Sequence, residues 1–312
     1  MLGVILLAQA LTLAVSGPAA SIAYLPIRVA LADGYFTREG LAVTVRPVRN
    51  AVEAADALVL GSADLAATTL EAMARRASGE AGSKVRLALG LTAVPPVALL
   101  ASATSPAPPR TVADLAGRKI AIGSPGPDET WLVAILARSR LDPRKLQIVG
   151  VGDRNLGHAL ETADAAAALV AEPLAGQLLA SGHATLLADL RTHSAAAETL
   201  DAPTVDAAVF ARADRLPRPG ILAAFSRAIL AAEQRIAGGD AAGLGAHLPR
   251  EITARPEEFA ARVAAAAPVY LPTGEVSVER VRTSLDLIAR RIPLPLTGQL
   301  PKASELVITR PR

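Results

Sequence analysis

Residues 61–69 read GSADLAATT, and residues 161–167 repeat the start of this pattern as ETADAAA. In each stretch the alanine-rich segment around the aspartate predicts a short buried strand between a helix and a helix-opening loop. A repeat at equivalent points of the chain indicates two similar lobes. The alternative is a chance match, because the chain is rich in alanine throughout.

On both sides of these stretches, short apolar strands alternate with helices rich in alanine and leucine, which is typical of α/β proteins. We expect strands at 11–15, 42–47, 64–67, 85–91, 119–122, 146–151 and 205–211, and helices at 27–33, 52–60, 70–77, 112–116, 128–139, 219–237, 256–266 and 278–290. The expected architecture has two lobes, each a sheet flanked by helices. Crossing hinge strands join the lobes, and a small molecule would bind in the cleft between them.

The lobe boundaries follow from the breaks in this pattern. A proline-rich stretch at 105–109 and the strand at 205–211 enclose one complete α/β segment. We therefore expect lobe 2 at 103–204 and lobe 1 at 11–102 plus 205–312.

The amino terminus resembles part of a secretory signal. Residues 1–27 are uncharged, but Gly17-Pro18 interrupts them, so a membrane-spanning helix is not expected. Val4–Leu7 forms an apolar centre, and Ala8-Gln9-Ala10 matches the small-x-small cleavage pattern. We interpret residues 1–10 as a truncated signal peptide. The alternative is a buried strand with an apolar lead-in.

This interpretation predicts export with cleavage after Ala10. Sequencing the amino terminus of the native protein should then begin near Leu11. Extending the chain upstream should leave the cleavage position unchanged. An unprocessed cytoplasmic product would contradict the prediction.

Composition excludes several classes of protein. With 51% hydrophobic residues the chain is globular, and with 3% aromatic residues and a net charge of +3 it lacks the stacking platforms and basic stripe of a nucleic-acid binder. Cysteine is absent, which removes disulfides, thiolate catalysis and an amino-terminal lipid anchor. No common nucleophile, phosphate-binding or zinc motif is present, and the four histidines lack ligand spacing. We expect neither an enzyme nor a metal or cofactor site.

The most informative loop is 123–130, which leaves one strand and opens a helix. Gly126 allows close approach of a ligand to the backbone, and Ser124 offers a hydroxyl. Asp128 and Glu129 either cap the helix or point into the cleft to meet an amine or a ring N–H group. The second reading favours a zwitterionic or cationic ligand.

Two other strand ends carry candidate ligand-binding residues. Thr68 and Thr69 end a lobe 1 strand, where their hydroxyls either contact the ligand or cap the next helix. Glu172 occupies the equivalent point of lobe 2, and we expect its carboxylate to be hydrated in the absence of ligand. Trp131, the only tryptophan, either packs in the core or stacks on a ligand ring.

Four segments resemble the periplasmic type 2 binding proteins of ABC transporters, in the nitrate, sulfonate, taurine and thiamine-precursor binding class. The likeness lies in Ser21–Pro26 with Ala30–Leu41, then in Gly61–Thr69, Asp114–Ala121 and Asp164–Pro173, and it covers about residues 11–190. It implies ligand contacts near Tyr24, Thr68, Thr69, the 124–129 loop and Glu172. Ala171 stands where many relatives have an aromatic residue. Asp128 and Glu129 replace expected hydroxyl residues, which disfavours nitrate and simple alkanesulfonates.

The resemblance implies a monomeric, periplasmic solute-binding component of an ABC importer. Its partners would be a small polar organic ligand, either sulfonate-like or taurine-like or else pyrimidine-like or thiamine-precursor-like, and the transmembrane permease subunits. The alternative is an enzyme on the same scaffold, of the pyrimidine-forming or menaquinone-pathway type. A third reading is a sensory ligand-binding domain, although neither a membrane segment nor a coiled coil follows Arg290.

Overall fold

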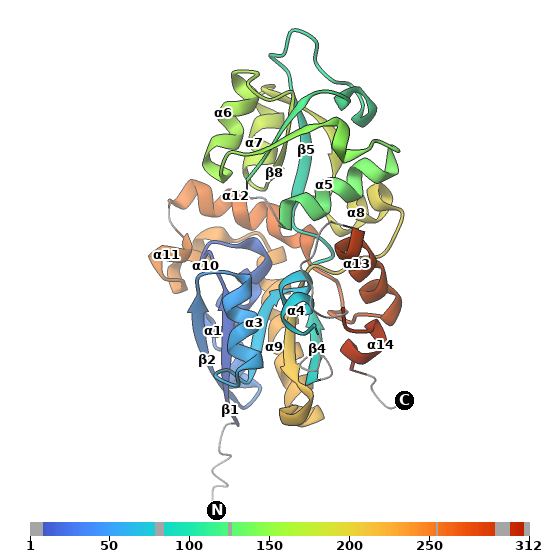
Figure 1. Cartoon of the computed structure of the whole chain (residues 1–312). Coiled ribbons are helices and arrows are strands. Elements are labelled where there is room, and N and C mark those ends of the chain that lie inside the picture. The colour runs from blue at the N-terminus through green and yellow to red at the C-terminus, as the bar shows by residue number, and fades with distance from the viewer. Residues whose placement is uncertain (1–8, 79–83, 124–126, 254, 291–299, 309–312) are drawn as a thin grey trace, which may run out of the picture. The chain divides into compact units, whose positions relative to one another are not determined.

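The computed structural model describes residues 9–78, 84–123, 127–253, 255–290 and 300–308 (Figure 1). The chain forms two compact units. Unit 1 comprises Met1–Ala93, Val205–Leu285 and Pro295–Arg312, and unit 2 comprises Val94–Thr204 and Asp286–Leu294. Within the described residues, no helix is both long and apolar enough to span a bilayer.

Each unit contains its own five-stranded sheet, and the two sheets have the same strand order. In unit 1 the order is β2 (Leu41–Val48), β1 (Gln9–Ser16), β3 (Leu65–Thr69), β10 (Ala207–Arg212) and β4 (Val85–Gly90). In unit 2 it is β7 (Gln147–Gly150), β6 (Lys119–Ile122), β8 (Ala167–Ala171), β5 (Val97–Ser102) and β9 (Ala184–Asp189). In both sheets only the fourth strand runs against the others. The expected α/β fold with two sheets is confirmed.

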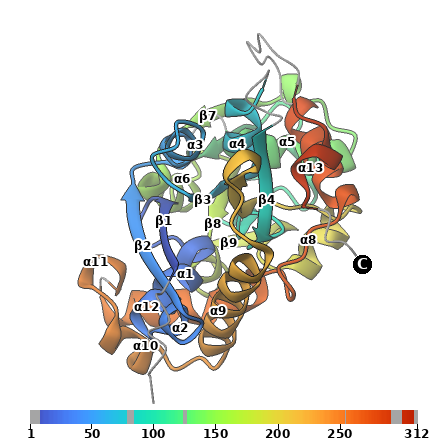
Figure 2. The same ribbon diagram turned by 90° about the horizontal axis from the view of Figure 1, so that it is seen from below.

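Helices cover both faces of the unit 1 sheet because its central strands bury side chains on both sides. Leu13 and Val15 of β1 face a core built with α1 (Leu25–Ala32), α9 (Pro219–Ala237) and α12 (Pro256–Ala266). The opposite face is covered by α3 (Ala51–Val59), which packs on β1, β3 and α4 (Leu70–Arg76) (Figure 2). The other helices are α2 (Tyr35–Arg38), α10 (Ala241–His247), α11 (Arg250–Thr253), α13 (Val278–Arg290) and α14 (Ala303–Leu306).

Unit 2 is built in the same way around two core clusters. On one face, Leu99, Ile120 and Leu169 pack with α5 (Pro127–Arg138) and α8 (His193–Leu200). On the other, Leu100 and Val170 pack with α6 (Leu156–Glu161) and α7 (Leu174–Ala180). Successive side chains of a strand point to opposite faces, and these strands carry apolar residues at consecutive positions, so both faces are apolar.

The unit boundaries differ from the expected ones at two points. Residues 94–102 belong to unit 2, because β5 pairs with β8 and β9 of the unit 2 sheet. The proline-rich stretch 105–109 therefore lies inside unit 2. The last part of α13, from Asp286, also belongs to unit 2.

The predicted signal peptide lies mostly outside the described residues. Its last two residues, Gln9 and Ala10, begin β1 and are in register with Leu41 and Ala42 of β2. The first strand is therefore longer than the predicted 11–15. Cleavage after Ala10 would remove two residues from its start.

Candidate functional site

The strand order places a topological switch point in each sheet. In unit 1 the chain leaves β1 for α1 on one face and leaves β3, the next strand, for α4 on the other. In unit 2 it leaves β6 for α5 and the adjacent β8 for α7, again on opposite faces. Ligands of open α/β sheets bind outside the carboxyl ends of such strand pairs. Thr68 and Thr69 end β3, and the other predicted site residues come after β1, β6 or β8 in the chain.

At the unit 1 switch point, Tyr24 lies among buried polar groups. Its side chain is 5% exposed, its hydroxyl hydrogen-bonds the Ser16 side chain at the end of β1, and the Asp206 carboxylate lies close by. Burial, and then the Asp206 charge, raise the pKa of Tyr24 well above its usual value, and the Ser16 hydrogen bond only partly opposes this. Tyr24 therefore keeps its proton and remains a hydrogen-bond donor.

Thr68 and Thr69 have structural partners of their own. The Thr68 hydroxyl is fully buried and donates to the Ala51 carbonyl at 2.8 Å. The Thr69 side chain caps α4 by accepting from the Ala72 N–H group at 3.2 Å. Helix capping was the alternative interpretation of these two threonines, and it describes Thr69. A ligand role for either residue remains a prediction.

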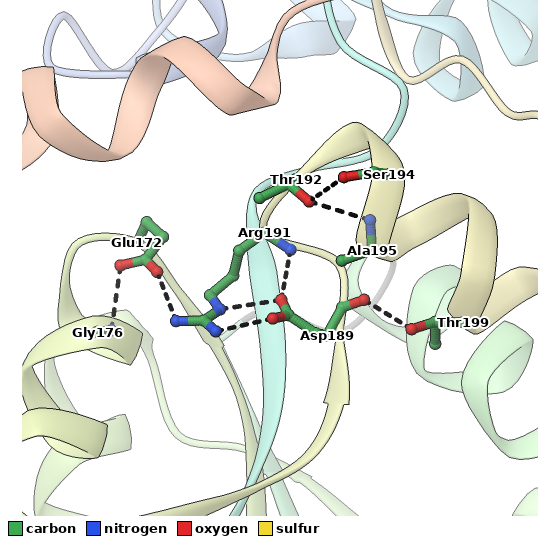
Figure 3. A network of polar contacts seen from close by, with 8 residues as sticks. All are labelled: Glu172, Gly176, Asp189, Arg191, Thr192, Ser194, Ala195 and Thr199. Carbon is green, nitrogen blue, oxygen red and sulfur yellow. Dashed lines mark hydrogen bonds and ion pairs between the residues drawn. The ribbon is translucent and has the colours of Figure 1, made fainter.

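At the unit 2 switch point, Glu172 belongs to a network with two other charged residues (Figure 3). One Glu172 oxygen lies 3.2 Å from Nη1 of Arg191, and the other accepts from the Gly176 N–H group at 3.1 Å. Arg191 also binds Asp189 in a bidentate manner, with Nε–Oδ1 and Nη2–Oδ2 distances of 2.9 and 2.7 Å. Burial alone would raise the pKa of Asp189, but the hydrogen bonds from Arg191 outweigh burial, and the pKa of Asp189 is lowered.

The expectation that Glu172 is hydrated without ligand is wrong. Its side chain is only 9% exposed, because it lies against Arg191 and the first turn of α7. It also caps that turn by accepting from the Gly176 N–H group. The network carries two carboxylates for one guanidinium, so this strand end retains a net negative charge.

The loop after β6 adds further carboxylates to the same sheet edge. Ser124 and Gly126 lie outside the described residues, and Asp128 and Glu129 are half-buried in the first turn of α5. A Cβ atom on Gly123 would lie 3.1 Å from Oδ2 of Asp128 and would overlap the Asp153 carboxylate. Gly123 thus makes room for both acids.

Trp131 follows this loop but packs inside unit 2. Its side chain is 6% exposed and belongs to the α5 and α8 core cluster. The packing interpretation therefore describes Trp131 in the structure.

Sequence reasoning missed two charged residues at these edges. Arg191 lies just beyond β9, and Asp206 lies just before β10 and is 8% exposed. The sequence signal for Arg191 was an aspartate at the end of a strand, Asp189, two residues before the arginine. Among the described residues, no group of acidic side chains and histidines could hold a metal ion.

Comparison with known proteins identifies relatives of this fold. The family model described as NMT1/THI5 like matches residues 21–237. The periplasmic aliphatic sulphonate-binding protein SsuA from Escherichia coli is similar in structure, with a TM-score of 0.68 and 19% identity over 90% of each chain. No curated protein sequence matches the chain.

Two further solved structures are similar over most of their length. One is a putative sulfonate ABC transporter periplasmic sulfonate-binding protein SsuA from Methylobacillus flagellatus KT, with a TM-score of 0.69 and 17% identity over 96% of this chain and 91% of that one. The other is the periplasmic nitrate-binding protein NrtA from Synechocystis PCC 6803, with a TM-score of 0.59 and 16% identity over 96% and 86%. The chain has the fold of periplasmic substrate-binding proteins.

Proposed function

Since the chain belongs to the NMT1/THI5-like family, we propose that it is the extracytoplasmic solute-binding component of an ABC importer. One observation carries this proposal. Both units present polar and charged side chains at the same switch point of the same strand order, as in Tyr24 and Glu172. Tyr24 follows the second strand of its sheet and Glu172 follows the third strand of its own, so both strands of the switch-point pair are used across the two units.

The proposed ligand is a small polar organic molecule that carries an amine or a ring N–H group. The unit 2 edge offers the carboxylates of Asp128, Asp153 and Glu172, and Glu172 shares the Arg191 guanidinium with Asp189. The unit 1 edge offers the Tyr24 hydroxyl next to Asp206. A bare inorganic anion would meet repulsion here, whereas a zwitterion such as taurine or an aminopyrimidine would find acceptors.

The proposal has consequences for partners and location. The ligand-bound protein would deliver its cargo to the transmembrane permease subunits as a monomer, and it would act in the periplasm after removal of a signal peptide. The sulfonate-binding and nitrate-binding relatives support the transport role and the compartment.

A matched pair of ligands tests the proposal. Taurine and ethanesulfonate differ only in the amino group, and 4-aminopyrimidine and nitrate extend the set. We expect a saturable rise in melting temperature with a compound bearing an N–H group, and calorimetric binding about tenfold weaker for its analogue lacking that group. Mass spectrometry of small molecules that co-purify with the protein broadens the search.

Variants locate the binding. Glu172→Gln should reduce the advantage of the N–H ligand, while Glu198→Gln, at an exposed carboxylate on α8, should leave it unchanged. If no compound binds and nothing co-purifies, the transport proposal fails. If binding is equal for both variants, the transport proposal stands but Glu172 has only a structural role.

A further inference from the structure

Unit 2 contains a cavity of about 390 Å³ near the carboxyl ends of α5, α8 and α13. It lies where α5 and α8 end, beside the last turn of α13, and all its lining residues belong to unit 2. Its apolar lining includes Ala134, Leu200 and Leu287, which pack in or against the same core cluster. Cavities of this size are typical of small-molecule sites.

Three arginines, Arg138, Arg140 and Arg290, also line this cavity. Arg138 forms an ion pair with Asp201 at 3.2 Å. Across the described part of the chain, the guanidinium groups of Arg140 and Arg290 make no hydrogen bond or ion pair. The cavity therefore combines an apolar wall with three exposed arginines.

Helix electrostatics explains only part of this arrangement. Arg138 and Arg290 occupy the last turns of α5 and α13, where positive charge stabilises the helix dipole. Arg140 lies beyond α5 and has a φ of 53°, in the left-handed region that favours glycine. This conformation ends α5 in a helix cap, in which the Arg140 and Leu141 N–H groups donate to the Ala137 and Leu136 carbonyls, and glycine is the usual residue there.

We propose that this cavity binds an amphipathic organic anion, with its apolar part against the leucine and alanine side chains and its carboxylate on Arg140 and Arg290. Guanidinium groups bind carboxylates through paired, charge-assisted hydrogen bonds. This site goes beyond the proposed transport function, since its α5 residues lie at the carboxyl end of that helix, whereas Asp128 and Glu129 lie at the end that follows β6.

Trp131 provides a local readout of this site. It is the only tryptophan, it lies on α5 one turn before Ala134, and it belongs to the core cluster that forms the cavity wall. Titration of the full chain with octanoate should change the Trp131 fluorescence in a saturable way, with a dissociation constant of about 1 mM or lower. Octanol, octylammonium and acetate each lack one of the two required features and should bind at least about tenfold more weakly.

Two variants test the role of the arginines. Arg290→Gln and Arg140→Gly should each weaken octanoate binding about tenfold. Because glycine relieves the left-handed strain, Arg140→Gly should keep or raise the melting temperature, by about 2 °C. If Arg140 had only a structural role, Arg140→Gly would not weaken octanoate binding while keeping or raising the melting temperature. Arg144→Gln, at an arginine with a 90% exposed side chain outside the cavity, is the matched control and should bind octanoate normally.

Three results would overturn the proposal: no saturable signal up to about 10 mM octanoate, equal binding of octanoate and octanol, or unchanged affinity in both arginine variants. Glu172→Gln should leave the octanoate titration unchanged. The octanoate site and the proposed transport function can therefore fail independently.

Discussion

Replacing Glu233 with glutamine is expected to stabilise the protein at pH 7. The wild type should lose stability as the pH rises from weakly acidic to weakly basic, and the variant should lose much less. Glu233 lies on α9 in unit 1 and is 8% exposed. No hydrogen bond or ion pair to its carboxyl group occurs among the described residues. Burial raises the pKa of Glu233 from 4.5 to about 8, because an unpaired carboxylate is poorly solvated there.

The direction of the pH dependence follows from the number of protons bound by the folded and by the unfolded protein. Between pH 4.5 and about 8 the folded protein holds a proton on Glu233 that the unfolded chain has released. Stability therefore falls as pH rises through this window, by about 1.4 kcal/mol per pH unit for one group. Glutamine has the shape of the protonated side chain and does not titrate. The variant should match the wild type near pH 4.5 and exceed it by about 3 kcal/mol at pH 7.

Urea unfolding of both proteins at several pH values measures this difference. Glu257→Gln, at an exposed glutamate on α12, is the control and should follow the wild-type curve. Parallel pH profiles for the wild type and Glu233→Gln would show that ionised Glu233 is well accommodated, which would contradict the prediction.

Much of the fold was predictable because hydrophobic periodicity is local. The strand at 119–122 and the helices at 219–237, 256–266 and 278–290 have the predicted bounds. The lobe boundary was not predictable in this way. All six residues of β5 are buried, and its partner strands β8 and β9 lie far along the sequence. An apolar strand carries no local signal of the sheet it joins.

The candidate site was predictable in position but not in contacts. Strand ends that open helices indicated Thr69 and Glu172, and the family resemblance implied Tyr24. Thr69 ends β3, and Tyr24 and Glu172 follow β1 and β8. The partner of Glu172 was not identified, because the contact with Arg191 depends on how β5 lies between β8 and β9. Long-range register of this kind cannot be read from spacing alone.

Arg191→Met is expected to destabilise unit 2, because it leaves Glu172 and Asp189 without their shared counter-charge. The side chains of Arg191, Glu172 and Asp189 are 24%, 9% and 23% exposed. Removing one partner of a buried ion pair costs about 3–5 kcal/mol, and partial exposure reduces the expected loss here to about 2–4 kcal/mol. Methionine keeps most of the arginine volume, so the loss reports charge rather than a cavity.

The pH dependence and a matched control separate this effect from general damage. Arg191 holds the pKa of Asp189 below its usual value, so the stability it adds is present above the unfolded value of 3.8 and is lost as pH falls. The loss in Arg191→Met should therefore shrink in acid. Arg144 binds Asp142 in the same bidentate manner, through Nε–Oδ1 and Nη2–Oδ2 contacts at the same two-residue spacing, but its side chain is 90% exposed. Arg144→Met should cause no measurable change by urea unfolding, since solvent screens that pair. Equal losses in the two variants would show that the Arg191 network contributes no more to stability than a surface ion pair. A loss independent of pH would show that the charge of Arg191 is not its cause.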